Sequence, residues 1–275
     1  QIESIVPLNL SSVDLTYVEP FVGSGAVFFR MKALYPNIQK SVINDVNSDL
    51  IAAYRCIKEK PAELIQSLKQ LSHHYFSFSL QQERAAFFYK IRSEFNTKQQ
   101  NNVEQSACLI FLNKTCFNGL YRVNLQNQFN APFGYYVNPT ICDEKNLEAV
   151  HHVLQDTEIL NVDFEQTYPY SNSQSFYYFD PPYKPISKTS SFTSYAKNSF
   201  KDEEQIRLKH FCDKLTKSGA MWLMSNSDVK NHDVNNHFFD ELYEDYKIQR
   251  VKAKRSINSK SSGRGEINEL LICNF

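Results

Sequence analysis

The chain has 275 residues, 42% of them hydrophobic, and its 30 basic and 30 acidic residues cancel. This length and composition exclude a disordered chain and suit one α/β domain that carries an inserted module. No apolar run reaches the roughly 20 residues that a membrane-spanning helix needs, and the first residues do not form a secretion signal. We therefore expect a soluble, cytoplasmic protein without a membrane partner.

The cysteines are spread along the chain without a Cys-x-x-Cys pair. This spacing predicts neither a zinc site nor a disulfide framework, and it suits free thiols in a reducing cytoplasm. We therefore expect no bound metal ion. The six residues are Cys56, Cys108, Cys116, Cys142, Cys212 and Cys273.

Short strands and helices alternate in the first and last parts of the chain. Apolar spacing and helix-start signals predict strands over 16–19, 41–44, 175–179 and 220–224, and helices over 26–35 and about 48–58. The last two strands end sharply, one at two prolines and the other at Ser225-Asn226-Ser227. Strands that end in polar or turn residues and lead into helices predict a parallel sheet, with its site at the carboxyl ends of the strands.

The middle of the chain has a different pattern. Apolar side chains have helical spacing from about residue 61 to 112, whereas 113–138 are rich in Asn, Gln, Gly and aromatic residues. The second stretch predicts a hairpin with loops. We therefore predict an inserted module over residues 56–144 and an α/β domain that is built from residues 1–55 and 145–275.

The first candidate site follows the first predicted strand and has the sequence Glu19-Pro20-Phe21-Val22-Gly23-Ser24-Gly25. Two glycines after a strand let the backbone approach a ligand closely, and the next helix start offers free N–H groups. The same turn can also serve only tight packing. Asp45 lies at the end of the second strand, where an acidic side chain accepts hydrogen bonds from ribose hydroxyls. As an alternative, Asp45 is a helix cap.

These two features together indicate a cofactor that contains a nucleoside. A nicotinamide-binding turn has a third glycine that is missing here, and Phe21 offers a ring that can lie against adenine. A nicotinamide-dependent oxidoreductase is therefore the weaker alternative.

The second candidate site is Asp180-Pro181-Pro182-Tyr183, directly after an apolar strand. The exocyclic amine of adenine is a poor nucleophile, because its lone pair is delocalised into the ring. A carboxylate and a backbone carbonyl can accept its two hydrogens and direct the lone pair toward an electrophilic methyl group. Prolines fix the backbone of that carbonyl, and a neighbouring aromatic ring can stack on the base. The structural alternative is a strand stopped by a Pro-Pro turn.

Nearly the whole chain resembles the Dam family of DNA adenine methyltransferases, including its DpnII type. The resemblance lies in residues 19–28, 44–51, 118–124, 129–134, 180–183, 192–195 and 223–226. It implies a Rossmann-like fold that binds S-adenosylmethionine, with an inserted, mainly helical DNA-recognition domain that carries a β-hairpin. It further implies methylation of adenine N6 in double-stranded DNA, in the palindrome GATC.

The resemblance also implies roles for individual residues. The cofactor would contact Glu19, Pro20, Phe21, Gly23, Gly25, Asp45, Asp163, Phe164 and Asp180. Asp163 and Phe164 follow a predicted strand end and would flank the adenine of the cofactor, although an ordinary loop carboxylate is an equal alternative for Asp163. Asp180, Pro181, Pro182 and Tyr183 would be the catalytic residues.

The third candidate site is the predicted hairpin of the insert, which joins hydrogen-bond donors, a cation and aromatic rings. An arginine can bind O6 and N7 of guanine together, and an apolar side chain can contact the thymine methyl group. The resemblance implies that Arg122 reads guanine, that Leu120 and Pro132 help with neighbouring bases, and that Phe117 wedges into the duplex. Asn118 and Asn124 complete this set; the alternative for each residue is packing on the helices.

A basic stretch without acidic residues runs from Lys247 to Arg264. By itself such a run is a solvated surface, but a DNA partner favours a loop that contacts phosphates. We assign this role to Lys254, Arg255, Asn258 and Arg264.

The start of the chain departs from the family, which begins with a Trp-x-Gly-Gly-Lys segment, whereas this chain opens at Gln1-Ile2-Glu3-Ser4. We expect that the natural chain is longer at its start. Two rival functions stay open: a catalytically silent DNA-binding protein of the same fold, and a methyltransferase for cytosine N4 or for adenine in RNA. The family context implies a prokaryotic cell or a phage-infected host, and a cognate restriction endonuclease that acts on the same site without a stable complex.

Overall fold

The computed structural model describes residues 5–7, 10, 14–184, 200–254 and 266–275. These residues divide into two compact units. The first unit contains the described residues up to Val46 and from Val162 onward, and the second is Asn47–Asn161. The segment 56–144, which the sequence marks as an insert, lies within the second unit.

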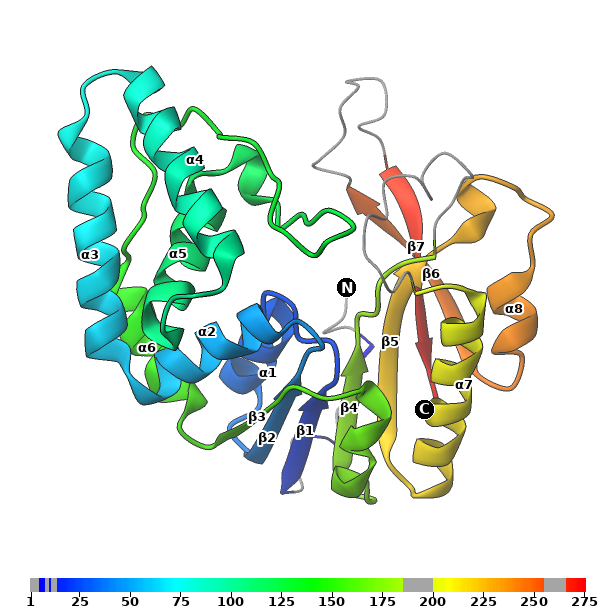
Figure 1. The fold of residues 1–275 in the computed structure, drawn as a ribbon. Helices are drawn as coiled ribbons and strands as arrows, with labels where there is room; N and C mark the ends of the chain where they lie inside the picture. The colour runs from blue at the N-terminus through cyan, green and yellow to red at the C-terminus, as the bar shows by residue number, and fades with distance from the viewer. Residues whose placement is uncertain (1–4, 8–9, 11–13, 185–199, 255–265) are drawn as a thin grey trace. The chain divides into compact units, whose positions relative to one another are not determined.

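A seven-stranded sheet has the strand order β3-β2-β1-β4-β5-β7-β6 (Figure 1). Strand β1 is parallel to β2 and to β4, and β4 is parallel to β5, whereas β7 is antiparallel to both β5 and β6. This arrangement confirms the predicted mixed α/β class. The strands are β1 (Leu15–Glu19), β2 (Ile38–Asn44), β3 (Thr157–Leu160), β4 (Ser175–Phe179), β5 (Met221–Ser227), β6 (Lys247–Lys254) and β7 (Glu266–Cys273).

The sequence prediction for β5 was wrong at its end. We expected the strand to stop before Ser225, but it continues through Ser227. The reason is pairing with β7: β4 pairs with Met221–Met224 only, whereas β7 pairs with Leu223–Ser227 from the other side. Backbone hydrogen bonds of the ladder therefore outweigh the low strand propensity of Ser and Asn.

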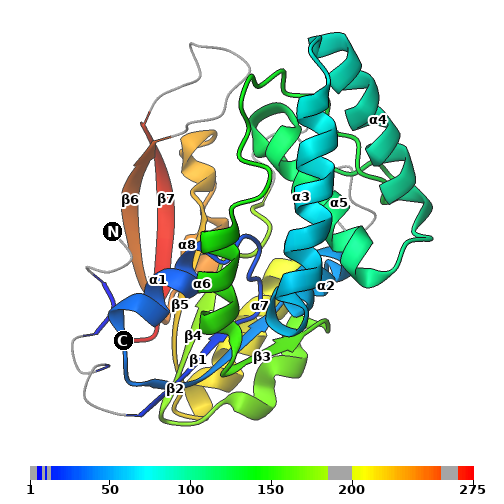
Figure 2. The ribbon, with the colours of Figure 1, turned by 90° about the vertical axis from the view of Figure 1, so that its left-hand side faces the viewer.

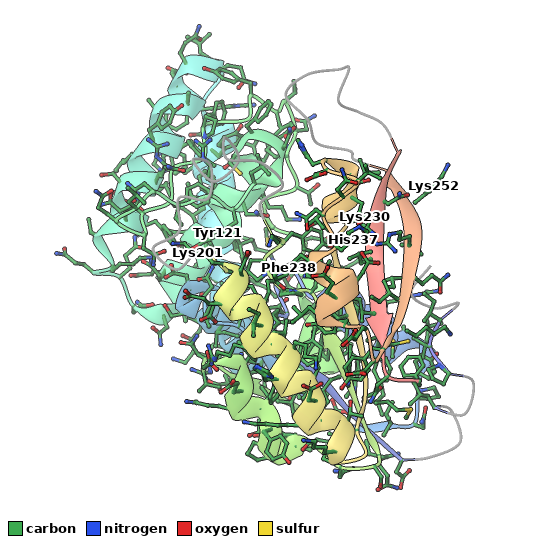
Figure 3. The ribbon with its side chains drawn as sticks, turned by 90° about the vertical axis from the view of Figure 1, so that its right-hand side faces the viewer. Tyr121, Lys201, Lys230, His237, Phe238 and Lys252 are labelled. Atoms are coloured by element: carbon green, nitrogen blue, oxygen red, sulfur yellow. The ribbon has the colours of Figure 1, made fainter. Side chains whose placement is uncertain are left out.

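The helices of the first unit are α1 (Ala26–Leu34), α7 (Asp202–Lys217) and α8 (Phe238–Leu242). Helix α7, the yellow helix of Figure 3, contacts β5. Its buried side chains Leu208, Phe211, Cys212 and Leu215 recur at the three-to-four spacing of an apolar helix face. Phe211 meets the rings of Phe179 and Phe164. Packing against α7 therefore fixes the carboxyl end of β4, where the catalytic residues are expected.

The second unit is a bundle of helices, drawn as a ribbon in Figure 2. Its core is rich in buried aromatic side chains. The predicted helical stretch 61–112 is confirmed as three helices. Asn101 separates the last two, because its side chain accepts hydrogen bonds from the N–H groups of Val103 and Glu104 and caps the new helix. The helices are α2 (Ser48–Glu59), α3 (Pro61–Ser77), α4 (Gln81–Thr97), α5 (Asn102–Thr115) and α6 (Glu144–Leu154).

All six cysteines are free thiols. Within the described ranges, no helix combines the length and the apolar character that crossing a membrane would need.

Candidate active site and recognition segment

Two glycines shape the loop between β1 and α1. Gly23 and Gly25 both have positive φ, at 47° and 73°, in the left-handed region that glycine adopts without steric cost. A Cβ added at Gly23 would meet no atom within 4 Å, so the space beside this backbone is open. The Gly23 N–H donates to Oδ2 of Asp45 at 3.1 Å. The structure thus brings the two predicted cofactor elements into direct contact.

Asn44 links three segments at the carboxyl end of β2, and the sequence analysis gave it no role. Its Nδ2 donates to the carbonyls of Pro20 and Val162, both at 3.0 Å, and its Oδ1 accepts from Val162 N–H at 2.9 Å. The side chain is fully buried. Asn44 therefore fixes the cofactor loop against the segment that carries Asp163 and Phe164.

Aromatic rings line the same end of the sheet. The Phe21 ring lies 5.4 Å from that of Phe164 and 5.6 Å from that of Phe200, measured between centroids. Phe200 was not identified from sequence. Residues from three segments that are far apart in the chain thus form one aromatic cluster, whose flat faces suit a purine ring.

Asp163 is held by a cation that the sequence analysis also missed. Arg207 of α7 forms an ion pair with Asp163, and it pairs with Glu165 and Glu204 at 3.2 Å and 2.9 Å. Its guanidinium lies over the Phe164 ring, 4.5 Å from the centroid. Asp163 also accepts from the Glu165 N–H at 3.0 Å and so caps the short helix that follows. Arg207 thereby fixes both Asp163 and Phe164.

The predicted catalytic segment follows β4 directly. Asp180 and Tyr183 line a cavity of about 460 Å³, together with Arg30 of α1, Ser225 of β5 and Glu269 of β7. Asp180 is exposed as a residue, yet the protein packed around its carboxyl group still limits the water that reaches it. This desolvation raises the pKa of Asp180, while hydrogen bonds from Ser225 and Tyr183 oppose the rise. Pro181 is buried and Pro182 is exposed.

Glu19 is 2% exposed at the end of β1. Its pKa is raised to about 8: burial is the main cause, a hydrogen bond from the Tyr17 hydroxyl opposes the rise, and the nearby Asp180 carboxylate adds to it. Two carboxyl groups therefore share this part of the site, and Glu19 is the one that holds a proton near neutral pH.

The predicted hairpin doubles back on itself, although it forms no continuous ladder. Two isolated antiparallel bridges join Cys116 to Phe133 and Val123 to Phe129. Asn124 holds the tip, because its Oδ1 accepts from the N–H groups of Gln126 and Gln128 at 3.0 Å and 2.9 Å. We call residues 116–137 the recognition segment.

Residues that we expect to contact bases are spread along this segment. Phe117 is 51% exposed, Asn118 has a φ of 56° and donates its N–H to the Tyr136 hydroxyl, and Leu120 is half-buried. Arg122 is exposed, and its Nε and Nη2 donate to the side chain and carbonyl of Asn130 at 2.7 Å and 2.8 Å. Pro132 is exposed.

One face of α4 supports the recognition segment. Arg84 donates to the Val137 carbonyl at 3.0 Å, Arg92 donates to the Ala131 carbonyl at 3.1 Å, and Asn96 pairs with Phe129. Phe88 of the same face packs on Phe133. Side chains at i, i+4 spacing along one face of α4 thus contact the returning arm at every second or fourth residue.

The basic stretch divides into two parts. Lys247–Lys254 form β6, and Arg250 pairs there with Asp228 and Asp240, at 2.9 Å and 2.8 Å. Arg255, Asn258 and Arg264 lie outside the described residues, as does the side chain of Lys254. In the part of the chain that the structure describes, no group of three or more His, Cys, Asp or Glu side chains could hold a metal ion.

Comparison with known proteins agrees with this geometry. Residues 1–257 match the profile of the D12 class N6 adenine-specific DNA methyltransferases. The chain is 46% identical to the Type II methyltransferase M.MjaIII of Methanocaldococcus jannaschii, over its whole length and 94% of that protein. It is 37% identical to the Type II methyltransferase M1.LlaDCHI of Lactococcus lactis, over 94% of the chain and 86% of the relative.

A third relative is the DNA adenine methylase of Escherichia coli, which is 33% identical over 92% of this chain and 84% of the relative. The profile match covers more than nine-tenths of the sequence, and the three alignments extend across both compact units. The chain therefore belongs to the D12 class of N6 adenine-specific DNA methyltransferases, and its substrate is DNA.

Proposed function

We propose that the chain transfers a methyl group from S-adenosylmethionine to N6 of an adenine in duplex DNA, within the sequence GATC. The observation that carries this proposal is the place of Asp180 beside the cofactor loop. Its neighbour Phe179 has its ring 6.4 Å from the ring of Phe21, and Asp180 itself opens into the cavity at the end of β4.

The residues around the loop fit this cofactor. The open space beside Gly23 admits a ligand, Asp45 offers a carboxylate for ribose hydroxyls, and the Phe21 and Phe164 rings offer faces for an adenine. We assign Glu19, Pro20, Gly25, Asp163 and Asp180 to the same site. When bound, S-adenosylmethionine supplies an activated methyl group on a sulfonium.

Asp180 and the Pro181 carbonyl are the groups that we propose to accept the two N6 hydrogens. Such acceptors direct the nitrogen lone pair toward the methyl group and stabilise the positive charge that builds on nitrogen. Tyr183 is 39% exposed beside the cavity and can stack on an adenine that has been extruded from the duplex. Most of the rate enhancement then comes from holding the two reactants in line.

We assign site recognition to residues 56–144, which contain the recognition segment. We propose that Arg122 reads guanine. Two observations support this role: Arg122 is exposed, and its guanidinium is held by a hydrogen bond to the Asn130 side chain. The choice of GATC rests on the resemblance to the Dam family. Because two of the relatives are named Type II methyltransferases, we also propose a cognate restriction endonuclease of the same specificity as a functional partner.

Expression of the chain in cells that lack adenine methylation tests this proposal. We expect plasmid DNA to gain N6-methyladenine at GATC and to resist an endonuclease that cuts only unmethylated GATC. Asp180→Asn should lower the single-turnover rate by about a hundredfold or more while DNA affinity is kept. The matched variant Asp233→Asn, at an exposed turn where Asp233 accepts from the Asn235 N–H at 3.0 Å, should keep wild-type activity. Methylation at another sequence would overturn the GATC assignment, and an active Asp180→Asn would overturn the catalytic one.

A further inference from the structure

The carboxyl end of β5 lies against the catalytic segment through three consecutive polar residues. Ser225, Asn226 and Ser227 are 5%, 0% and 4% exposed. Burying a polar side chain in a strand destabilises the fold unless the side chain has a hydrogen-bond partner. Here the partners belong to the catalytic segment or to a residue that contacts it.

Each of the three residues has a different target. Ser225 Oγ donates to Asp180 Oδ1 at 2.9 Å, and Ser227 Oγ donates to the Lys184 carbonyl at 3.4 Å. Asn226 acts through α7: its Nδ2 donates to Oε1 of Gln205 at 3.1 Å, and Nε2 of Gln205 donates to the Pro182 carbonyl at 3.3 Å. Every second residue from Asp180 to Lys184 is therefore held from the side of β5.

The direction of the bonds at Ser225 follows from its single hydroxyl proton. That proton can go to Asp180 at 2.9 Å or to the Phe179 carbonyl at 3.4 Å, and the shorter bond to a carboxylate is the stronger one. The Tyr178 hydroxyl lies 3.0 Å from Ser225 Oγ and must then be the donor of that pair. Burial raises the pKa of Tyr178, so this phenol keeps its proton. The result is a directed chain from Tyr178 through Ser225 to Asp180.

We propose that Ser225, backed by Tyr178, is a positioning residue that sets the orientation of the Asp180 carboxylate for methyl transfer. This inference rests on the proposed role of Asp180. A carboxylate rotates easily about its last side-chain bond, and a hydrogen bond to one oxygen fixes the direction of the other. Because the donor is itself buried and bonded, the carboxylate keeps one geometry before the substrate arrives.

Other groups also act on Asp180, and the test must separate them from Ser225. Glu19, which accepts a hydrogen bond from Tyr17, faces it from β1, and Tyr183 follows it in the chain. Arg30 from α1 and Glu269 from β7 line the same cavity. Of these groups, only Tyr183 joins Ser225 as a hydrogen-bond donor that holds the pKa of Asp180 down.

The experiment measures single-turnover methylation and the pH profile of kcat/KM for Ser225→Ala and Tyr178→Phe in the full chain. We expect Ser225→Ala to lower the turnover about tenfold to a hundredfold with little change in the Kd for DNA. Its acid limb should move to higher pH, because the lost hydrogen bond had favoured the ionised carboxylate. Tyr178→Phe should also lower the turnover and move the acid limb to higher pH, but by a smaller amount than Ser225→Ala.

Ser175→Ala is the control, because Ser175 is a fully buried serine at the other end of β4 that donates to the Tyr170 carbonyl at 2.7 Å. It should cost stability and leave the pH profile in place. A wild-type profile and turnover in Ser225→Ala, alongside an inactive Asp180→Asn, would overturn the positioning role and leave the proposed function intact. An active Asp180→Asn would instead contradict the catalytic role of Asp180, on which the positioning role of Ser225 and the proposed mechanism both depend.

Discussion

The side-chain amide of Asn96 pairs with both backbone groups of Phe129. Its Nδ2 donates to the Phe129 carbonyl at 3.0 Å, and its Oδ1 accepts from the Phe129 N–H at 2.8 Å. The Phe129 side chain is 1% exposed and lies edge-on to Phe95 of the same helix. The Asn96 side chain thus makes the two backbone hydrogen bonds that a neighbouring strand would make. It fixes the position of the recognition segment along α4.

We predict that Asn96→Ala weakens sequence discrimination more than it weakens binding to DNA in general. The change leaves a buried backbone N–H and C=O without their partner, which costs about 1 to 3 kcal/mol of stability. Methylation rates on GATC and on single-base variants check this, with Glu94→Gln, a half-buried residue of the same helix, as the control. Equal loss on every substrate, or none, would mean that Asn96 does not affect specificity.

Asp45→Ala should weaken binding of S-adenosylmethionine by about 1.5 to 3 kcal/mol, because the variant loses both the proposed ribose contact and the bond from Gly23 N–H. Isothermal calorimetry measures this directly. DNA affinity without cofactor should stay the same. Unchanged cofactor affinity would show that Asp45 only braces the loop.

Glu19 makes stability depend on pH. Its pKa is raised from 4.5 to about 8, mainly by burial, so between these values the folded chain binds more protons than the unfolded chain. Stability should therefore fall as pH rises through this window, with a slope of up to about 1.4 kcal/mol per pH unit from this group. Denaturant unfolding at pH 5 and pH 8 should show a smaller pH difference for Glu19→Gln than for wild type. An identical difference would contradict the assignment.

Local signals were enough to predict the elements that carry the chemistry. Strand β4 is found where the sequence placed it, over Ser175–Phe179, because an apolar run that ends at two prolines has few other conformations. The contact between the glycine loop and Asp45 was also predictable, since parallel neighbouring strands bring their carboxyl ends to one edge.

The residues that orient this chemistry were not predictable from one sequence. Ser225 lies 45 positions from Asp180, Arg207 lies 44 from Asp163, and Asn96 lies 33 from Phe129. No periodicity links partners at such separations, and a serine or asparagine near the end of an apolar run indicates a turn as readily as a buried bond.

The basic stretch shows the same limit. Lys254 was assigned to a phosphate-contacting loop, yet Lys247–Lys254 form a strand, because β7 supplies an antiparallel partner along its whole length. Arg250 is committed to Asp228, which is 1% exposed, and to Asp240. From sequence alone, an arginine that pairs with a buried carboxylate cannot be told from an arginine that binds phosphate.

The Arg122→Ala variant tests whether Arg122 contacts a base or a phosphate of the DNA. A bidentate contact to one guanine contributes about 1 to 3 kcal/mol of discrimination at that base pair, whereas a phosphate contact strengthens binding to every sequence alike. Arg122→Ala should therefore narrow the gap between GATC and sites altered at the guanine. Lys254→Ala should weaken all sites together and make the salt dependence less steep.

Asn130→Ala refines this prediction, because Asn130 accepts two hydrogen bonds from Arg122 and orders its guanidinium before DNA binds. We expect a partial loss of discrimination at the same base pair and at no other. Methylation rates on GATC and its single-base variants, at several salt concentrations, measure all three variants together. If Arg122→Ala lowers every substrate by one common factor with a shallower salt slope, the residue contacts phosphate, and guanine is read elsewhere on the recognition segment.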